Sequence, residues 1–281
     1  MAFSPNGRRL VLSSRALSLG TDDDLPVLDV SRLQMAFQFK GIGDATFDPQ
    51  GRWLTNGRQD GSIVIRDPQN GHELVTLNAG KLAPIRVLFR PDGRALAAIK
   101  LRGSLHLWDT ETWKPIEPLM PTEKQVTAIA WTPDSKFFAI AFPAEVQILD
   151  AVTRSVVRKI PMRHVPLVLG FSPDGGTLAI GGRSRVLDFY VTATREHARS
   201  LVGNPATVNS QAFHPNGMRI ATTGADGFIR IWDVTTGQEV LALPNGGTDS
   251  FGVAWDPSGR DLFTVGRGLR VWKSNMSFPV P

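Results

Sequence analysis

Residues 207–243 read TVNSQAFHPNGMRIATTGADGFIRIWDVTTGQEVLAL, and they contain four strand-like runs separated by three turn signatures. The first turn, His214 to Gly217, has proline at the second position of a type I turn and glycine at the fourth. Asp226-Gly227 then separates two β-rich runs, which is a strong hairpin signal because both turn positions must tolerate a positive φ. Apolar residues alternate along Ile229–Trp232, as a half-buried strand requires. The stretch therefore predicts four short antiparallel strands.

The same unit recurs along the whole chain. An aromatic-x-Pro turn stands at seven places: Phe3-Ser4-Pro5, Phe47-Asp48-Pro49, Phe89-Arg90-Pro91, Trp131-Thr132-Pro133, Phe171-Ser172-Pro173, Phe213-His214-Pro215 and Trp255-Asp256-Pro257. The prolines are 44, 42, 42, 40, 42 and 42 residues apart. A period in the low forties with four short strands in each unit is typical of a radial β-propeller.

The ends of the third strands carry a family resemblance. Leu107-Trp108-Asp109 and Ile231-Trp232-Asp233, with the degenerate Ile65-Arg66-Asp67 and Ile148-Leu149-Asp150, resemble the WD-repeat β-propellers, in a degenerate form of bacterial type. The resemblance covers essentially all 281 residues. It implies an all-β fold, a seven-bladed β-propeller of four-stranded antiparallel blades, with incomplete first and last blades. We expect a single propeller domain over residues 1–281, with blades near 1–40, 41–80, 81–121, 122–162, 163–203, 204–244 and 245–281.

The resemblance also implies a polar link between adjacent strands, which we call the polar tie. In it, an aspartate at the hairpin turn is connected to the neighbouring strand through a histidine and a serine or threonine. This sequence keeps the turn aspartate only at Asp60 and Asp226 and lacks Gly-His before most first strands. We therefore expect the tie to be mostly missing.

Composition narrows the class of protein. No apolar run approaches the roughly 20 residues of a membrane helix, and the opening residues lack the apolar segment of a signal peptide. Because the chain has no cysteine, disulfides and thiolate metal sites are excluded. We expect a cytoplasmic protein that does not bind a membrane.

The formal net charge of +5 at pH 7 would favour an anionic partner. However, the 23 arginines are distributed over all the units, and no basic stretch is interleaved with aromatic residues. We therefore do not expect nucleic-acid binding.

The two ends of the chain look incomplete as a propeller. Only Met1 and Ala2 precede the first turn, and only 273–281 follow the third strand-like run of the last unit. We therefore expect a fragment of a longer chain. An open edge on the last blade would also allow a partner to add a strand.

Catalytic and metal-binding motifs are absent from the sequence. It contains no Gly-x-Ser-x-Gly, phosphate-binding loop or His-Glu-x-x-His motif, and the five histidines fall at different points of the repeat. The acidic triplet at residues 22–24 lacks the further ligands of a calcium loop. We predict no catalytic residues, no metal site and no cofactor.

The loops that join second to third strands carry most of the candidate binding residues. Such loops open on one side of a propeller, and here they bear arginines that could form a basic ring around the channel mouth for acidic partners. These arginines are Arg15, Arg58, Arg102, Arg183, Arg185 and Arg267. Trp53 and Trp113 lie outside the repeat's core positions, so we expect them to be exposed, and Trp113 is a further candidate for partner contact.

The sequence thus predicts a non-catalytic scaffold or adaptor that binds protein partners, rather than an enzyme. Two alternatives stay open. The first is a regulatory or sensory region of a larger signalling protein, such as a bacterial kinase. The second is a propeller hydrolase or lactonase, because residues 146–157 faintly resemble a repeat of such enzymes.

Overall fold

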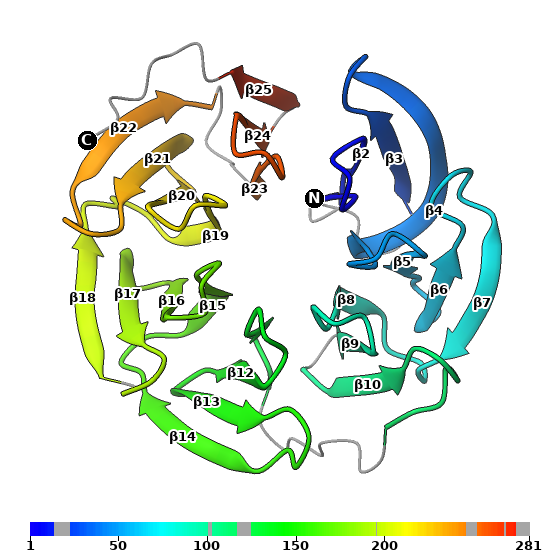
Figure 1. The fold of residues 1–281 in the computed structure, drawn as a ribbon, viewed down its shortest axis with the longest axis horizontal. Coiled ribbons are helices and arrows are strands. Elements are labelled where there is room, and N and C mark those ends of the chain that lie inside the picture. The colour runs from blue at the N-terminus through cyan, green and yellow to red at the C-terminus, as the bar shows by residue number, and fades with distance from the viewer. Residues whose placement is uncertain are drawn as a thin grey trace. The chain divides into compact units, whose positions relative to one another are not determined.

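The computed structural model describes residues 1–13, 23–100, 103–116, 125–194, 196–245, 252–266 and 268–273. The chain divides into two compact units, Met1–Val126 and Thr127–Pro281, which we describe separately. Every regular element in the described ranges is a β-strand, and Figure 1 shows the strands in chain order.

The first unit contains ten strands. They are β1 (Ala2–Phe3), β2 (Arg9–Val11), β3 (Asp23–Asp29), β4 (Gln34–Phe47), β5 (Leu54–Gly57), β6 (Ser62–Arg66), β7 (Glu73–Asn78), β8 (Pro84–Phe89), β9 (Ala95–Lys100) and β10 (Leu105–Asp109). Strands β1 to β7 form one sheet in sequence order, and β8 to β10 form a three-stranded sheet.

The second unit contains fifteen strands. They are β11 (Ala128–Trp131), β12 (Phe137–Phe142), β13 (Glu145–Asp150), β14 (Val156–Pro161), β15 (Pro166–Phe171), β16 (Thr177–Gly182), β17 (Val186–Val191), β18 (His197–Val202), β19 (Val208–Phe213), β20 (Arg219–Gly224), β21 (Phe228–Asp233), β22 (Glu239–Pro244), β23 (Gly252–Trp255), β24 (Asp261–Val265) and β25 (Leu269–Lys273). They form three four-stranded sheets and a three-stranded one, all in sequence order. All pairs are antiparallel, as the hairpin signals predicted.

The prediction of seven four-stranded blades is wrong. The described strands make five sets of four, namely β1–β4, β4–β7, β11–β14, β15–β18 and β19–β22, whereas β8–β10 and β23–β25 have three. After β10 the described residues add one isolated bridge, Trp108 to Pro115, beside which the Ile116 N–H donates to the Leu107 carbonyl at 2.9 Å. The first repeat does contain four strands, so the prediction that it is incomplete is also wrong, although β1 has only two residues.

The first two sets share one strand because β4 is long. It pairs with β3 through its first half and with β5 through its second half. The register shifts between Ile42 and Ala45, and Gly43 lies between them with φ of 70°. A bulge therefore bends the strand where the sequence suggested a boundary between two blades.

The predicted turns form as their residues require. In the turn that follows β19, the Gly217 N–H donates to the His214 carbonyl at 2.8 Å, and Gly217 has φ of 76°. Ser135 takes the same place in its own repeat with φ of 61°. The hairpin glycine Gly227 has φ of 78°, which is the conformation predicted from Asp226-Gly227.

A polar tie does join strands of the second unit, with asparagine in place of histidine. The Trp232 indole Nε1 donates to Thr222 Oγ1 at 2.9 Å, and that hydroxyl donates to Asn204 Oδ1 at 3.3 Å. All three side chains are buried. The tie stabilises the pairing of β20 with β21 and anchors the segment before β19.

The same relay recurs in the next repeat. Trp272 Nε1 donates to Thr264 Oγ1 at 3.1 Å, and Thr264 donates to Asn245 Oδ1 at 2.8 Å. In these two repeats a relay that ends at asparagine, without the turn aspartate, therefore takes the place of the expected tie. The sequence search looked for Gly-His, whereas an asparagine oxygen accepts the same bond.

In the first unit an arginine fills the position of the tryptophan. Arg66 stands on β6 where Trp232 stands on β21, and it is 3% exposed. Its Nε donates to Asn56 Oδ1 at 2.8 Å, its Nη1 donates to the Gly71 carbonyl at 3.0 Å, and its guanidinium lies 4.6 Å from the centre of the Phe39 ring. The degenerate Ile-Arg-Asp end of this strand is thus a buried polar anchor.

Candidate functional site

The predicted basic ring is only partly described by the structure. Arg15, Arg102 and Arg267 lie outside the described residues. Arg58 lies in the β5–β6 turn of the first unit and is already ion-paired with Glu73. Arg183 and Arg185 lie in the β16–β17 turn of the second unit and are exposed. The described arginines therefore provide one exposed pair, in the second unit.

Trp113 and Trp53 are not exposed as predicted. Both are half-buried and pack against the core of the first unit, around residues such as Phe89 and Trp108. Their rings meet edge to face with centres 4.9 Å apart, and the Arg52 guanidinium lies 4.0 Å from the centre of the Trp53 ring. Both tryptophans therefore contribute to packing of the first unit.

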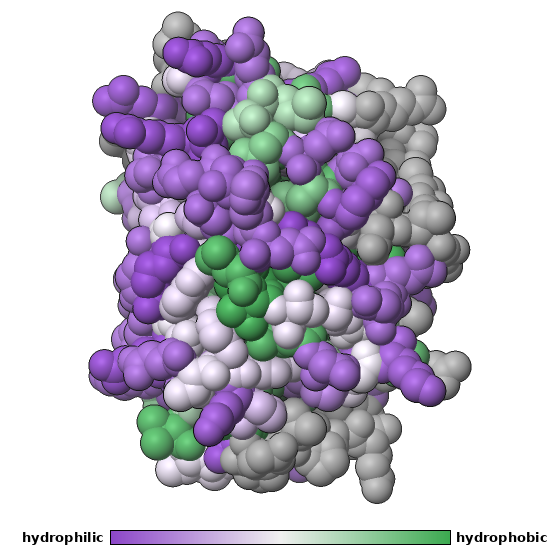
Figure 2. Space-filling view, turned by 90° about the vertical axis from the view of Figure 1, so that its right-hand side faces the viewer, coloured by the Kyte–Doolittle hydropathy of each residue, from purple (hydrophilic) through white to green (hydrophobic). Residues whose placement is uncertain are grey.

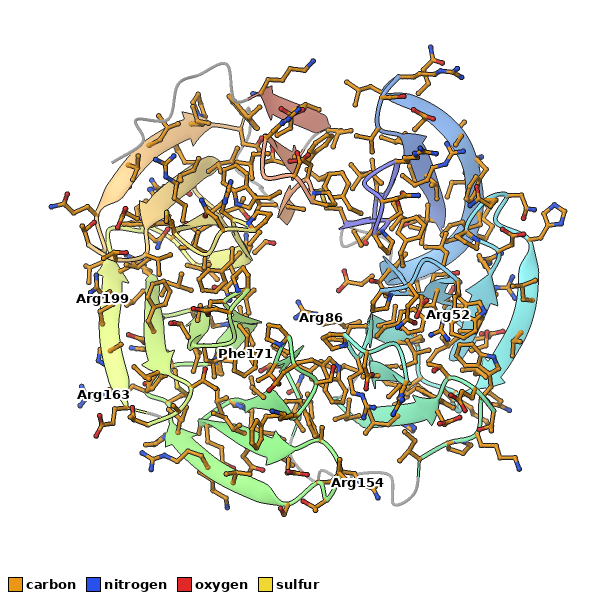
Figure 3. The ribbon with its side chains drawn as sticks, in the orientation of Figure 1. Arg52, Arg86, Arg154, Arg163, Phe171 and Arg199 are labelled. Atoms are coloured by element: carbon orange, nitrogen blue, oxygen red, sulfur yellow. The ribbon has the colours of Figure 1, made fainter. Side chains whose placement is uncertain are left out.

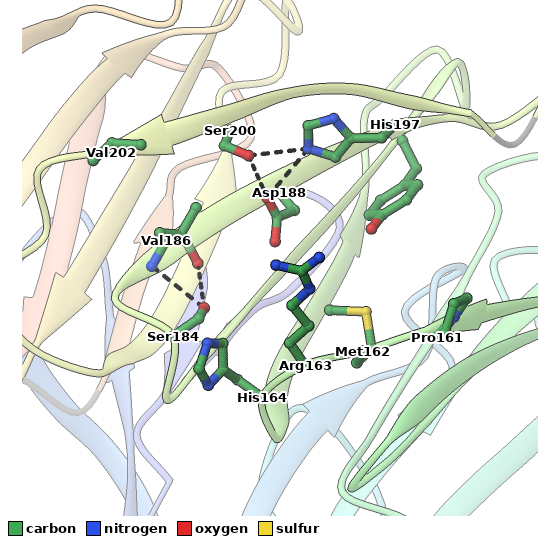
Figure 4. Close-up of a pocket in the computed structure, with 11 residues that line it drawn as sticks. Pro161, Met162, Arg163, His164, Ser184, Val186, Asp188, His197, Ser200 and Val202 are labelled. Atoms are coloured by element: carbon green, nitrogen blue, oxygen red, sulfur yellow. Dashed lines mark hydrogen bonds and ion pairs between the residues drawn. The ribbon is translucent and has the colours of Figure 1, made fainter.

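A groove in the second unit lies beside the exposed arginine pair. It has a volume of about 530 Å³ and is formed by the β14–β15 connection and one face of β17 and β18 (Figure 4). Its lining residues are Pro161, Met162, Arg163, His164, Ser184, Val186, Asp188, Tyr190, His197, Ser200 and Val202. The groove combines apolar walls with cationic, hydroxyl and carboxylate groups.

Close backbone contact holds the two walls of the groove together. The Arg183 backbone N–H donates to the Val165 carbonyl at 3.2 Å. At Gly182 an added Cβ would lie 2.4 Å from that same carbonyl oxygen, so this approach requires glycine. The β16–β17 turn, with Ser184 in the groove and an arginine on each side of it, is therefore fixed against the β14–β15 connection.

A cluster of Asp188, His197 and Ser200 forms one wall of the groove. Asp188 Oδ1 accepts a hydrogen bond from Ser200 Oγ at 2.5 Å and lies 3.3 Å from His197 Nε2. The same histidine nitrogen lies 3.0 Å from Ser200 Oγ. A hydrolytic triad needs the serine on one imidazole nitrogen and the carboxylate on the other. Here both meet Nε2, so the cluster provides no proton relay and instead orients the Asp188 carboxylate.

Tyr190 contacts this cluster through His197. Its ring lies edge-on to the His197 imidazole, with centres 5.4 Å apart. Burial, with a smaller contribution from the Asp188 carboxylate, raises the pKa of the Tyr190 phenol. The phenol thus stays protonated and is a hydrogen-bond donor rather than a base.

Arg163 is the main cationic group inside the groove. Figure 4 shows its side chain rising from the connection into the groove, with the guanidinium on the side of Asp188. Among the described residues its side chain makes no ion pair or hydrogen bond, and the same is true of Arg183 and Arg185. Arg154, Arg163 and Arg199 project at the outer edge of this unit (Figure 3). The unpaired guanidinium groups of Arg163, Arg183 and Arg185 are available to bind an anion.

The positive charge of the protein is concentrated in the part of the chain that builds this groove. Residues 151–225 contain nine Arg and Lys but three Asp and Glu, a net of +6, against +5 for the whole chain. The sequence analysis counted arginines unit by unit and found them distributed, because it did not subtract the acidic residues. The absence of Asp and Glu between Asp150 and Asp174 is the signal that would have indicated this segment.

Other surfaces of the described residues have fewer side chains suited to ligand binding or catalysis. A second cavity of about 290 Å³ has Asp134 and Asp174 in its lining, but hydrogen bonds within their own turns, led by Thr132 and Ser172, lower the pKa of both carboxyls. Within the described ranges, no group of three or more His, Asp or Glu could hold a metal ion. No helix among them is long and apolar enough to cross a membrane.

The outer strands of the first unit present some apolar surface. Figure 2 looks onto the side where β4 and β7 lie and shows apolar atoms within a mostly hydrophilic surface. The exposed large apolar side chains of this unit are Leu33, Met35, Leu74 and Leu82. An apolar area rimmed by polar residues is typical of a protein contact surface.

Comparison with known proteins supports a WD-repeat β-propeller. Residues 195–233 match the family model described as WD domain, G-beta repeat. WD repeat-containing protein 1 of Rattus norvegicus is 26% identical over 250 residues, covering 82% of this chain and 40% of that protein. WD40 repeat protein poxJ of Penicillium oxalicum is 26% identical over 278 residues, covering 88% of this chain and 77% of that protein.

A solved structure shows the same fold. The β-propeller domain of Cps50 (Swd1) from Myceliophteria thermophila matches with a TM-score of 0.82 at 16% identity, covering 96% of this chain and 94% of that one. The chain spans about 40% of the length of the rat relative. WD-repeat proteins are typically non-catalytic scaffolds for protein interactions, in agreement with the function predicted from the sequence. The relatives named here are animal and fungal and give no support to a bacterial type.

Proposed function

We propose that this chain is a non-catalytic scaffold that binds protein partners, acidic ones in particular, through surfaces of its loops and outer strands. The observation that carries the proposal is the set of unpaired guanidinium groups in and beside the groove of the second unit: Arg163 lines the groove, and Arg183 and Arg185 lie on the adjoining β16–β17 turn. The only Ser, His and Asp cluster there lacks the geometry of a proton relay. Such a surface suits binding of an anionic partner rather than hydrolysis.

The predicted arginine ring is kept as part of this proposal. In it Arg183 and Arg185 contribute more than Arg58, because Arg58 must first break its ion pair with Glu73. Strand addition at the edge of β25, a cytoplasmic location and the absence of nucleic-acid and membrane binding also belong to the proposal. Cell fractionation tests the location.

Affinity capture with chemical cross-linking tests the scaffold function. The intact chain and a variant with Arg58, Arg102, Arg183 and Arg185 each changed to Glu would be used on lysate of the source cells, after both are shown to melt cooperatively. We expect partners that the wild type retains and the variant loses. Retention of no protein above the level of an unrelated protein of equal charge would contradict the proposal.

An activity screen tests the hydrolase alternative. We expect no turnover of ester or lactone substrates by the purified chain. Turnover that disappears in Ser200→Ala or His197→Ala would show that the cluster is catalytic after all.

A further inference from the structure

The groove of the second unit has the features of a binding site for an extended, negatively charged ligand. Its unpaired cation Arg163 lies on one wall, and Arg183 and Arg185 flank Ser184 on the turn that forms the other. The Arg183 backbone bond to Val165 fixes these two walls against each other. One guanidinium group in the groove and two on the adjoining turn thus lack carboxylate partners among the described residues.

The surrounding segment strengthens the attraction for an anion. Residues 151–225 carry the net charge of +6, and the only carboxylate in the groove is Asp188. One oxygen of Asp188 already accepts from Ser200 and contacts His197. A partner's carboxylates would therefore meet an excess of donors, and guanidinium groups bind carboxylates through paired N–H donors.

The lining favours a peptide over a nucleic acid. Half-buried Met162 and Val186, with Val202 at 73% exposed, give the groove apolar walls suited to side chains. Its one phenol ring, Tyr190, is half-buried and in edge-to-face contact with His197, and a single such ring provides no series of aromatic faces on which successive bases could stack. The Asp188 carboxylate can accept hydrogen bonds from the backbone N–H groups of a peptide, whereas a phosphate group offers no such donor.

We propose that this groove binds an acidic segment of a partner protein, whose Asp or Glu side chains pair with Arg163, Arg183 and Arg185 while neighbouring apolar side chains contact Met162, Val186 and Val202. The site rests on the proposed scaffold function and places its acidic contact on the outer part of the second unit. It differs from the arginine ring predicted from the sequence, because Arg163 lies between strands β14 and β15.

Fluorescence anisotropy with defined probes tests the site. The probes are a labelled glutamate-rich peptide that contains a few leucines and a labelled oligouridylate. The groove variant carries Arg163→Glu, Arg183→Glu and Arg185→Glu. The matched control carries Arg32→Glu, Lys81→Glu and Lys114→Glu, which are exposed residues of the first unit. Each variant changes the formal net charge from +5 to −1.

We expect the wild type to bind the peptide and the groove variant to bind it at least about tenfold more weakly, since each lost exposed ion pair has a modest effect. The control variant should lose much less affinity for the peptide. Both variants must melt at the wild-type temperature, and a variant with lysine at the three groove positions, which keeps the charge, should retain binding.

Three outcomes would overturn the proposal. They are absence of peptide binding by the wild type, equal weakening in the groove variant and the control, and tighter binding of the oligouridylate than of the peptide at the same salt. If the wild type and the groove variant capture the same partners from lysate, the scaffold function stands and this groove is not the site. If neither captures a partner while the peptide still binds to the groove, the scaffold function fails separately.

Discussion

Removal of one hydroxyl, in Thr222→Val, tests the tie that replaces the family's histidine. Thr222 Oγ1 accepts from Trp232 Nε1 at 2.9 Å and donates to Asn204 Oδ1 at 3.3 Å, and both Thr222 and Trp232 are 1% exposed. Valine has nearly the same shape, so the change leaves an indole N–H and an amide oxygen buried without this partner. Each buried unsatisfied group costs about 1–3 kcal/mol, and we expect a loss of about 2 kcal/mol.

Thermal and urea unfolding measure this loss. A loss of about 2 kcal/mol should lower the Tm by about 4–8 °C, with an unchanged m-value in urea. Thr222→Ser keeps the hydroxyl, so its free energy of unfolding should decrease less than that of Thr222→Val. The decisive comparison is a double-mutant cycle with Trp232→Phe, which has no N–H to leave unsatisfied.

The cycle separates the hydrogen bond from other effects of the substitution. In the Trp232→Phe background, Thr222→Val should cost clearly less than it does in the wild type. If it costs the same in both backgrounds, the loss arises from packing or strand propensity, and the proposed relay contributes nothing to stability.

Three further predictions concern other parts of the fold. Arg66→Met should destabilise the chain by about 2–4 kcal/mol in urea unfolding, because it removes charged donors from the buried Asn56 side chain and a backbone carbonyl; a neutral result would show that Arg66 is not an anchor. Trp113→Ala should lower the free energy of unfolding by about 2 kcal/mol through lost packing on Trp53, and it should leave capture of partners unchanged, so that a folded variant with lost capture would restore Trp113 as a binding residue. Hydrogen bonds, above all from the Thr236 backbone N–H, lower the pKa of Asp233 below its ordinary 3.8. The stabilisation they give is present above the unfolded-state pKa and is lost as pH falls through the lower folded-state pKa. As the pH is lowered below about 4, the urea concentration at the midpoint of unfolding should therefore decrease, and it should decrease less steeply in Asp233→Asn. A midpoint that does not depend on pH in this range would contradict the assignment.

The candidate site was only partly accessible from the sequence. Arg183 and Arg185 were found because a turn between two strands is exposed, and this is a local property. Arg163 was missed because it lies in the connection after β14, and only the bond from Arg183 to Val165 places it beside that turn. Trp113 was misjudged because its position in the repeat says nothing of Trp53, sixty residues earlier in the chain, against which it packs.

The sequence by itself determined the local features of this protein: the strands, their antiparallel hairpins and the turns at Gly217 and Gly227. These depend on φ preferences and on alternation within a few residues, so they can be read from a short stretch. It also determined the propeller fold, because a period of about forty residues repeats a unit that cannot bury its apolar faces alone.

The tertiary structure alone decided which strands join into one sheet, which side chains complete the polar ties and where the groove lies. The shared strand β4, Asn204 in the place of a histidine and the pairing of Arg66 with Asn56 all depend on contacts between residues distant in the chain. A hydrogen bond requires only a donor and an acceptor at the right distance, so several residue types can satisfy one position. For that reason the geometry of the fold, and no sequence motif, identifies both the ties and the binding groove.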